Sequence, residues 1–204
     1  MIELIFATNN LHKAKEIQAA IGRDINIITL VEAGITIDIP EPYHTLMENA
    51  SKKSGTIFKL TGKSCFSEDT GLEVDALHGE PGVKSARYTD NDLIFNSNVE
   101  KLLFKMERVK KRTARFRTII SLRIQEEEFF FEGLCEGSIA EKALGTNGFG
   151  YDPVFIPAGS DRTFADMTMK EKSVFSHRRK AGDKLVVFLQ HMLTVNNVAG
   201  TKTR

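Results

Sequence analysis

The sequence predicts an α/β fold with a mixed β-sheet and helices packed on its faces. Three patterns lead to this expectation: a strand, helix and strand in succession at the start, a long alternating run followed by a second extended run, and an amphipathic helix near the end. The first pattern is typical of a parallel βαβ unit, and the second favours an antiparallel hairpin. Both kinds of pairing are therefore expected in one sheet.

The βαβ unit is expected within the first 31 residues. Residues 2–7 form a short apolar run that predicts a buried strand, and residues 25–31, rich in β-branched side chains, predict another. The polar residues 8–10 open a helix between them, with apolar side chains at helical spacing, and Gly22 closes it. A second helix is expected over residues 45–60.

The next segment combines short strands with an acidic loop. Residues 65–67 and 72–77 predict two strands on either side of Glu68-Asp69-Thr70-Gly71. This arrangement places the two acids at a strand end rather than on an exposed helix. A helix is expected over residues 91–107 after a polar loop.

A long strand is expected over residues 113–125. Apolar side chains occupy one face there, and Arg115, Arg117 and Arg123 occupy the other. Residues 128–139 are expected to pair with it as a hairpin.

The last part of the chain predicts a short strand over residues 154–156 and an amphipathic helix over residues 176–193. Since no linker or repeat interrupts residues 1–195, we expect a single domain there, which at this length is either one large domain or a domain of two lobes. Residues 196–204 are polar and are expected to form a C-terminal tail.

Composition restricts the function classes. The chain has 204 residues, 41% hydrophobic, and a net charge of +1, so no broad field points to DNA or to a membrane surface. Cys65 and Cys135 stand alone in apolar runs, which indicates buried thiols in a reducing compartment rather than a zinc site. The first residues are not expected to act as a signal peptide, and no apolar run approaches the ~20 residues of a membrane span. A cytoplasmic protein is expected.

Two polar clusters follow predicted strands. Thr8-Asn9-Asn10 with Lys13 lies where a strand meets a helix start, which can bind an anion, although spacing alone equally allows a plain helix cap. Glu68 and Asp69 offer hard oxygen ligands suited to Mg²⁺, and a carboxylate free of the metal could activate water. Taken alone, the quartet fits an acidic turn better. Upstream, Glu48 pairs with Lys52 at helical spacing, which leaves Lys53 free to reach a phosphate.

Two later clusters extend the pattern. The stretch Gly148-Phe149-Gly150-Tyr151-Asp152 allows close backbone approach and offers a ring for base stacking, or else forms an ordinary turn before a strand. A capping box, Thr168 with Glu171, predicts a short helix carrying Lys172, and Ser176 caps the final one. His177 and Arg178 then fall in its first turn, where positive charge is unfavourable, which hints at an anionic or carbonyl-bearing partner.

Together and in this order, the clusters resemble the inosine/xanthosine triphosphate pyrophosphatase family. The matching stretches are Ala7-Thr8-Asn9-Asn10 with Lys13 and Glu16; Glu48-Asn49-Ala50 with Lys53; Glu68-Asp69-Thr70-Gly71-Leu72; Gly79 and Pro81-Gly82-Val83 with Ser85-Ala86-Arg87-Tyr88; Gly148-Phe149-Gly150-Tyr151-Asp152-Pro153 with Phe155; Thr163-Phe164-Ala165; and Glu171-Lys172 with Ser176-His177-Arg178. The resemblance covers nearly the whole chain.

The resemblance implies a long twisted mixed sheet, two lobes with a nucleotide cleft between them, and a homodimer. It implies that water attacks the α-phosphorus of ITP, dITP or XTP and that pyrophosphate leaves with Mg²⁺. Glu41 and Asp69 would bind the metal, and Asp69 or Glu68 would accept the proton. The implied substrate contacts are Thr8, Asn9, Asn10, Lys13 and Lys53 for the triphosphate, and Thr70, Phe149, Gly150, Tyr151, Asp152, Lys172, His177 and Arg178 for the nucleoside.

The sequence departs from the family pattern in places, and other functions stay open. Bacterial members often have Asp-Asp-Ser-Gly where this chain has Glu68-Asp69-Thr70-Gly71, and Pro42-Tyr43 replaces the usual Thr-Gly after Glu41. One alternative is a pyrophosphatase for modified pyrimidine or methylated guanine nucleotides. Others are a non-catalytic nucleotide sensor and an RNA-binding module that uses the arginine face, although the acids at residues 126–128 end that basic stretch.

Overall fold

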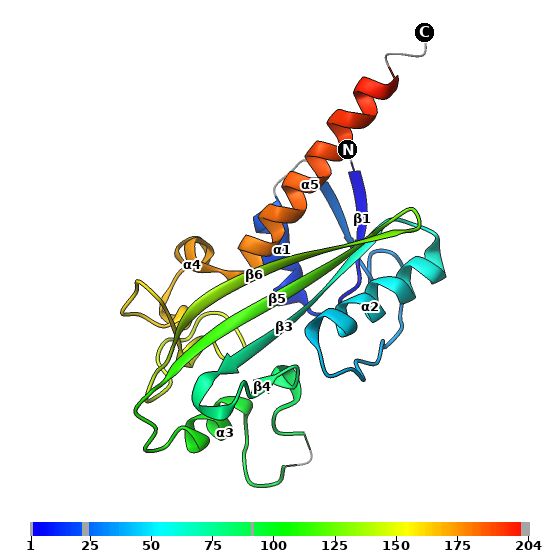
Figure 1. Ribbon diagram of the computed structural model, residues 1–204. Coiled ribbons are helices and arrows are strands. Elements are labelled where there is room, and N and C mark those ends of the chain that lie inside the picture. The colour runs from blue at the N-terminus through cyan, green and yellow to red at the C-terminus, as the bar shows by residue number, and fades with distance from the viewer. Residues whose placement is uncertain (1, 22–24, 91, 201–204) are drawn as a thin grey trace.

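A computed structural model describes residues 2–21, 25–90 and 92–200. Its seven-stranded sheet has the order β2-β1-β3-β5-β6-β7, with β4 paired to β3. Parallel and antiparallel pairs both occur, so the predicted mixed α/β fold is confirmed (Figure 1). The strands are β1 (Ile2–Phe6), β2 (Ile25–Thr29), β3 (Cys65–Val74), β4 (Pro81–Gly82), β5 (Thr113–Ile124), β6 (Glu127–Ile139) and β7 (Phe155–Pro157).

The predicted βαβ unit is confirmed. Strands β1 and β2 pair in parallel, and α1 (Leu11–Ile21) connects them. Ile17 and Ile21 of α1 are buried against the sheet, as the helical spacing predicts. The expected closing residue, Gly22, lies outside the described residues.

The prediction of two short strands around the acidic quartet is wrong. Residues 65–74 form one continuous strand, β3, and all ten pair with β5, so that Glu68 faces Ile120 and Asp69 faces Ile119. Ladder hydrogen bonds to a long partner outweigh the turn preference of Thr70-Gly71, and this partner is not visible from local sequence. The two acids therefore lie in mid-strand.

The other edge of β3 has a gap. In the described part of the chain, β1 pairs with β3 only as far as Phe66, and β4 pairs with it from Leu72 on. Residues 67–71 of β3, here called the open edge, lie between these two short neighbours. Strands β3, β5 and β6 run from the end of the sheet that holds β1 and β2 to the end that holds β4, as Figure 1 shows. These two ends are here called the two lobes.

The hairpin of β5 and β6 is confirmed, with Thr113 opposite Ser138 and Ile124 opposite Glu127. Its arginines are neutralised across the strands. Arg117 lies 2.5 Å from Glu132, and Arg123 lies 2.7 Å from Glu128. The basic face predicted from the sequence is thus a row of cross-strand ion pairs.

Helix α2 (Leu46–Thr61) covers one face of the sheet, and α1 with α5 (His177–Gly200) covers the other (Figure 1). Thr45 caps α2 through the backbone N–H of Glu48, and its hydroxyl donates to that side chain at 2.7 Å. Glu48 is therefore engaged with Thr45, not with Lys52 as the spacing had suggested.

Two helix lengths differ from expectation. The helix predicted over residues 91–107 is α3 (Asn98–Lys105), because Ser97 caps it by accepting from the N–H of Glu100; Asn91 lies outside the described residues. Helix α4 (Met169–Phe175) has the predicted capping box. Helix α5 runs beyond residue 193 to Gly200, since no proline or glycine interrupts it from residue 183 on.

The core has separate parts in the two lobes. In one lobe, Leu4, Phe66 and Leu122 of the sheet pack with Leu185 and Leu189 of α5. In the other, the far ends of β3, β5 and β6 pack with α3 and with residues 151–167. Among the described residues, no helix is both long and apolar enough to span a bilayer.

We expect Gly133→Ala to destabilise the fold by about 1–3 kcal/mol through overpacking. A Cβ at Gly133 of β6 would lie 2.0 Å from the carbonyl oxygen of His177 and 2.6 Å from the nitrogen of Ala181, so α5 would have to move. The control is Gly55→Ala in α2, where the nearest atom is 3.6 Å away and alanine should stabilise by up to ~1 kcal/mol. Urea unfolding of both variants measures this; equal effects would contradict the close packing of α5.

Candidate active site

A cavity of about 420 Å³ lies at the open edge of β3, between the lobes. Its size suits a small-molecule ligand. Except for Glu68, which lies beneath its wall, every predicted site residue lines it: Thr8, Asn9, Asn10, Lys13, Glu41, Lys53, Asp69, Thr70, Phe149, Gly150, Tyr151, Asp152, Lys172, His177 and Arg178. The structure therefore gathers at one place residues that lie up to 170 positions apart.

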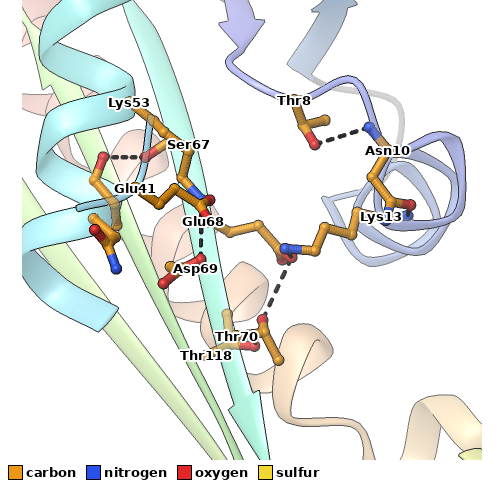
Figure 2. A network of polar contacts seen from close by, with 12 residues as sticks. Thr8, Asn10, Lys13, Glu41, Lys53, Ser67, Glu68, Asp69, Thr70 and Thr118 are labelled. Carbon is orange, nitrogen blue, oxygen red and sulfur yellow. Dashed lines mark hydrogen bonds and ion pairs between the residues drawn. The ribbon is translucent and has the colours of Figure 1, made fainter. Parts of the chain in front are cut away.

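The start of α1 forms one wall. Thr8 Oγ1 accepts from the N–H of Asn10 at 3.1 Å, and Asn10 Oδ1 accepts from the N–H of Lys13 at 3.1 Å (Figure 2). These bonds fix the turn between β1 and α1. Asn9 Nδ2 donates to the carbonyl of Ile37 at 3.4 Å. The wall combines a helix N-terminus with the ammonium of Lys13, which is a favourable surface for an anion.

Because successive strand residues point to opposite faces, Glu68 and Asp69 have different neighbours. Asp69 turns toward α2, where Lys53 Nζ lies 3.0 Å from its Oδ1 and 2.5 Å from Glu41 Oε1 (Figure 2). Arg87 Nη1 lies 2.8 Å from Glu41 Oε2. Burial raises the pKa of Asp69, although the nearby lysines oppose it. Burial alone would also raise the pKa of Glu41, but Lys53 and Arg87 outweigh it and lower that pKa.

Glu68 turns toward α1 and α5. Arg178 Nε donates to its Oε2 at 2.7 Å, Arg178 Nη2 donates to its Oε1 at 3.0 Å, and Lys13 Nζ lies 3.1 Å from the same Oε1. Burial alone would raise the pKa of Glu68, yet Arg178 and Lys13 outweigh it and hold that pKa far below its ordinary value. Both oxygens of Glu68 are thus engaged with cations, so Asp69 is better placed than Glu68 to contact a ligand.

Glu16 links this pair to the far wall. Its carboxylate accepts from Arg178 and, at 2.7 Å, from Lys172, whose Nζ also lies 2.6 Å from Asp152 Oδ2. Asp152 in turn accepts from the N–H of Phe149 at 2.9 Å. A Cβ at Gly148, with φ of 75°, would lie 2.0 Å from Asp152 Oδ2, so glycine is needed there. The glycine-rich turn is therefore held by a buried ionic network.

Aromatic rings complete this wall. The rings of His177 and Phe116 stack at 4.6 Å, and those of His12 and Phe149 at 5.2 Å. His177 is buried, with no partner for its Nδ1 among the described residues. Burial and the charges of Arg178 and Lys172 lower its pKa well below the ordinary value, so the ring is neutral near pH 7. Tyr151 donates to the carbonyl of Ser85 at 3.0 Å.

Several residues in or next to the cavity wall received no role from the sequence. Glu16 and Arg87 stand within matched stretches, and their charge was the only available signal. Thr118 Oγ1 lies 2.6 Å from Thr70 Oγ1, and the side chains of residues 37–39 complete the wall near Asn9. Pairing across β3 and β5 brings Thr118 to the site, and no local pattern marks it.

The arrangement can hold a divalent cation together with a phosphate ligand. Asp69 Oδ2 is buried without a hydrogen-bond partner among the described residues. The carboxylates of Asp69 and Glu41 both contact the ammonium of Lys53, so they lie close together. Among those residues, no three His, Cys, Asp or Glu side chains could hold a metal by themselves. Mg²⁺ binds through one or two carboxylates completed by phosphate oxygens and water, so these two carboxylates fit it.

Comparison with known proteins identifies the family. A model described as the Ham1 family matches residues 4–188. The chain belongs to the Ham1 family. A dITP/XTP pyrophosphatase of Porphyromonas gingivalis is 46% identical, over 93% of this chain and 98% of that protein. The dITP/XTP pyrophosphatase of Flavobacterium johnsoniae is 42% identical, over 92% of this chain and 98% of that protein. The solved structure of the Staphylococcus aureus Ham1 protein matches with a TM-score of 0.82 at 37% identity, over 93% of this chain and 99% of that one.

In this Ham1 protein we expect Glu68→Gln to lower the free energy of unfolding by about 3 kcal/mol, because it removes the carboxylate that pairs with both Lys13 and the buried Arg178 and leaves Glu16 to balance the Arg178 charge. The matched control is Glu132→Gln, which removes a half-exposed partner of Arg117 and should cost less than ~1 kcal/mol. Urea unfolding at pH 7 compares them.

The same pair predicts a pH dependence. Since the folded-state pKa of Glu68 is lowered, its contribution is complete above the unfolded pKa of about 4.3 and is lost as pH falls below it. The difference between wild type and Glu68→Gln should therefore shrink in acid. A difference that stays constant from pH 7 to pH 3 would contradict the ion pair.

Proposed function

We propose that this chain hydrolyses non-canonical purine nucleoside triphosphates, such as ITP, dITP and XTP, to the monophosphate and pyrophosphate. One observation carries the proposal: at the open edge of β3, a carboxylate–lysine cluster suited to a metal triphosphate shares a cavity with an aromatic and basic wall suited to a purine. The relatives named dITP/XTP pyrophosphatases support the reaction and the substrate class.

The residues around α1 and α2 would hold the triphosphate. Thr8, Asn9 and Asn10 present the helix N-terminus to it, while Lys13 and Lys53 supply positive charge from the two sides of β3. Phosphoryl transfer depends mainly on positioning and charge neutralisation, so such a cradle is the main requirement.

The hydrolytic step is assigned to Asp69. Water would attack the α-phosphorus, with Asp69 accepting the proton and pyrophosphate as the leaving group. The buried Asp69 lines the cavity, and its Oδ2 has no hydrogen-bond partner among the described residues. Glu68 is fully engaged by Arg178 and Lys13, so its part is to position these cations.

Glu41 and Asp69 would hold the cofactor, which we propose to be Mg²⁺. The bound ion would supply charge neutralisation on the phosphate oxygens. Two carboxylates are enough protein ligands for an ion whose remaining ligands are phosphate and water.

The opposite wall would recognise the nucleoside. Phe149 offers a stacking surface, and Gly150, Tyr151, Asp152 and Thr70 enclose the remaining volume. Lys172, His177 and Arg178, which line the same cavity, would read the base. A C6 carbonyl accepts hydrogen bonds, whereas the amino group of adenine donates them, so donors in this wall would leave adenine unpaired and rejected.

We also propose a cytoplasmic homodimer. The family resemblance supports the dimer. Both cysteines are free and buried, and burial raises the pKa of Cys65 to about 12 and that of Cys135 to about 11. Such unreactive thiols suit a reducing compartment.

With Mg²⁺ present, we expect the chain to release pyrophosphate from ITP, dITP and XTP at kcat/KM values about 10²-fold or more above those for ATP. GTP should also be a weak substrate. Omitting Mg²⁺ should abolish turnover. Pyrophosphate and orthophosphate are measured separately. Equal rates on hypoxanthine, xanthine, adenine and guanine nucleotides would contradict a preference for non-canonical purines, and orthophosphate as first product would contradict attack at the α-phosphorus.

We expect Asp69→Asn to lower kcat for ITP by about 10²–10⁴-fold, the usual contribution of a general base. The matched control is Glu73→Gln on the same strand. The Glu73 carboxylate lies 3.9 Å from Arg115 Nη1 and 3.8 Å from Arg117 Nη1, and Glu73 does not line the cavity. It should keep near-wild-type kcat, and a fall similar to that of Asp69→Asn would assign the loss to the strand as a whole.

A further inference from the structure

Lys53 occupies the point where two cavity carboxylates converge. Its ammonium lies 2.5 Å from Glu41 Oε1 and 3.0 Å from Asp69 Oδ1, and the residue is only 7% exposed. In the described chain, Asp69 Oδ2 has no hydrogen-bond partner beside it. The position of the ammonium is thus the position that a cation shared by Glu41 and Asp69 would take.

We propose that Lys53 takes the place of the metal ion in the ligand-free protein. Its ammonium holds Glu41 and Asp69 together until metal and nucleotide enter as a pair. The inference deepens the proposed function and rests on it. When the pair enters, Glu41 and Asp69 would release the ammonium and hold the metal, and the Lys53 ammonium would pair with the polyphosphate.

The exchange follows from the charges. A metal that enters alone must displace the ammonium from two buried carboxylates, and the ammonium gains no new anion in return. A nucleotide supplies that anion, since Lys53 lines the cavity and its four-carbon stem is flexible. Nucleotide-free protein should therefore bind metal weakly, and removal of the ammonium should strengthen that binding.

The test is Mn²⁺ binding to nucleotide-free protein, followed by the electron paramagnetic resonance signal of free Mn²⁺. Relative to wild type, Lys53→Met should bind Mn²⁺ at least ~10-fold more tightly, because opposite charges at this range interact by more than the energy of one decade in affinity. The matched control is Lys13→Met, which removes the same charge from the same cavity but from beside Glu68. Its gain should be clearly smaller.

An equal gain in both variants would mean that only net charge matters, and no gain in Lys53→Met would mean that the lysine does not compete; either result overturns the proposal. Urea unfolding checks that the variants are folded. If Lys53→Met does not fold, amine acetylation of wild type decides: saturating Mn²⁺ should speed labelling of Lys53 and leave the exposed Lys52 unchanged, and unchanged labelling of Lys53 would overturn the proposal.

No nucleotide is used in these measurements, so they are independent of the hydrolysis assay. A chain that fails to hydrolyse ITP but shows the gain in Mn²⁺ affinity would refute the proposed function alone. Normal hydrolysis with no gain would refute the role of Lys53 alone.

Discussion

The site depends on a gap in the sheet. Strand β3 extends beyond the end of β1 before it meets β4, and over this open edge its side chains reach both faces of the sheet and the cavity between the lobes. Alternation along the strand then sends Asp69 toward α2 and Glu68 toward α1 and α5. Two adjacent acids can serve two different tasks only because the strand is extended there. A turn, which the quartet alone favours, would have placed both carboxylates in solvent.

Charge balance around this edge explains why so many ionisable groups can be buried. Lys53 is held by Glu41 and Asp69, Lys13 by Glu68, and Arg178 by Glu68 and Glu16. Each group would be costly to bury alone, and each becomes tolerable because its partners satisfy both charge and hydrogen bonds. These pairs join α1, α2, β3 and α5, so the same network that stabilises the lobes also holds the cavity walls. A ligand that brings both negative phosphates and a cation can enter such a site by exchange of partners, without leaving any charge unpaired.

Local patterns predicted most elements and the pairing of strands that are neighbours in sequence, but not the pairing of β3 with β5. Helical spacing identified α1, and alternation identified β5, because each pattern reports a buried face formed by neighbouring residues. The error at Glu68 and Asp69 had a different origin: the continuity of β3 comes from β5, about 50 residues later in the chain. For the same reason, cluster chemistry and family resemblance together indicated the cavity residues, whereas Thr118 and the linking role of Glu16 depend on contacts between distant segments.

The departure from the usual family pattern at residue 68 acquires a physical meaning in this arrangement. The extra methylene of Glu68 extends its carboxylate toward α5 and not toward Asp69, because the two side chains leave opposite faces of β3. There the carboxylate accepts two hydrogen bonds from the Arg178 guanidinium. This bidentate geometry suits arginine, whose N–H groups are fixed in one plane, better than lysine. The change from aspartate to glutamate therefore alters the support of Arg178 and Lys13. It leaves the pair of Glu41 and Asp69, the proposed metal ligands, untouched.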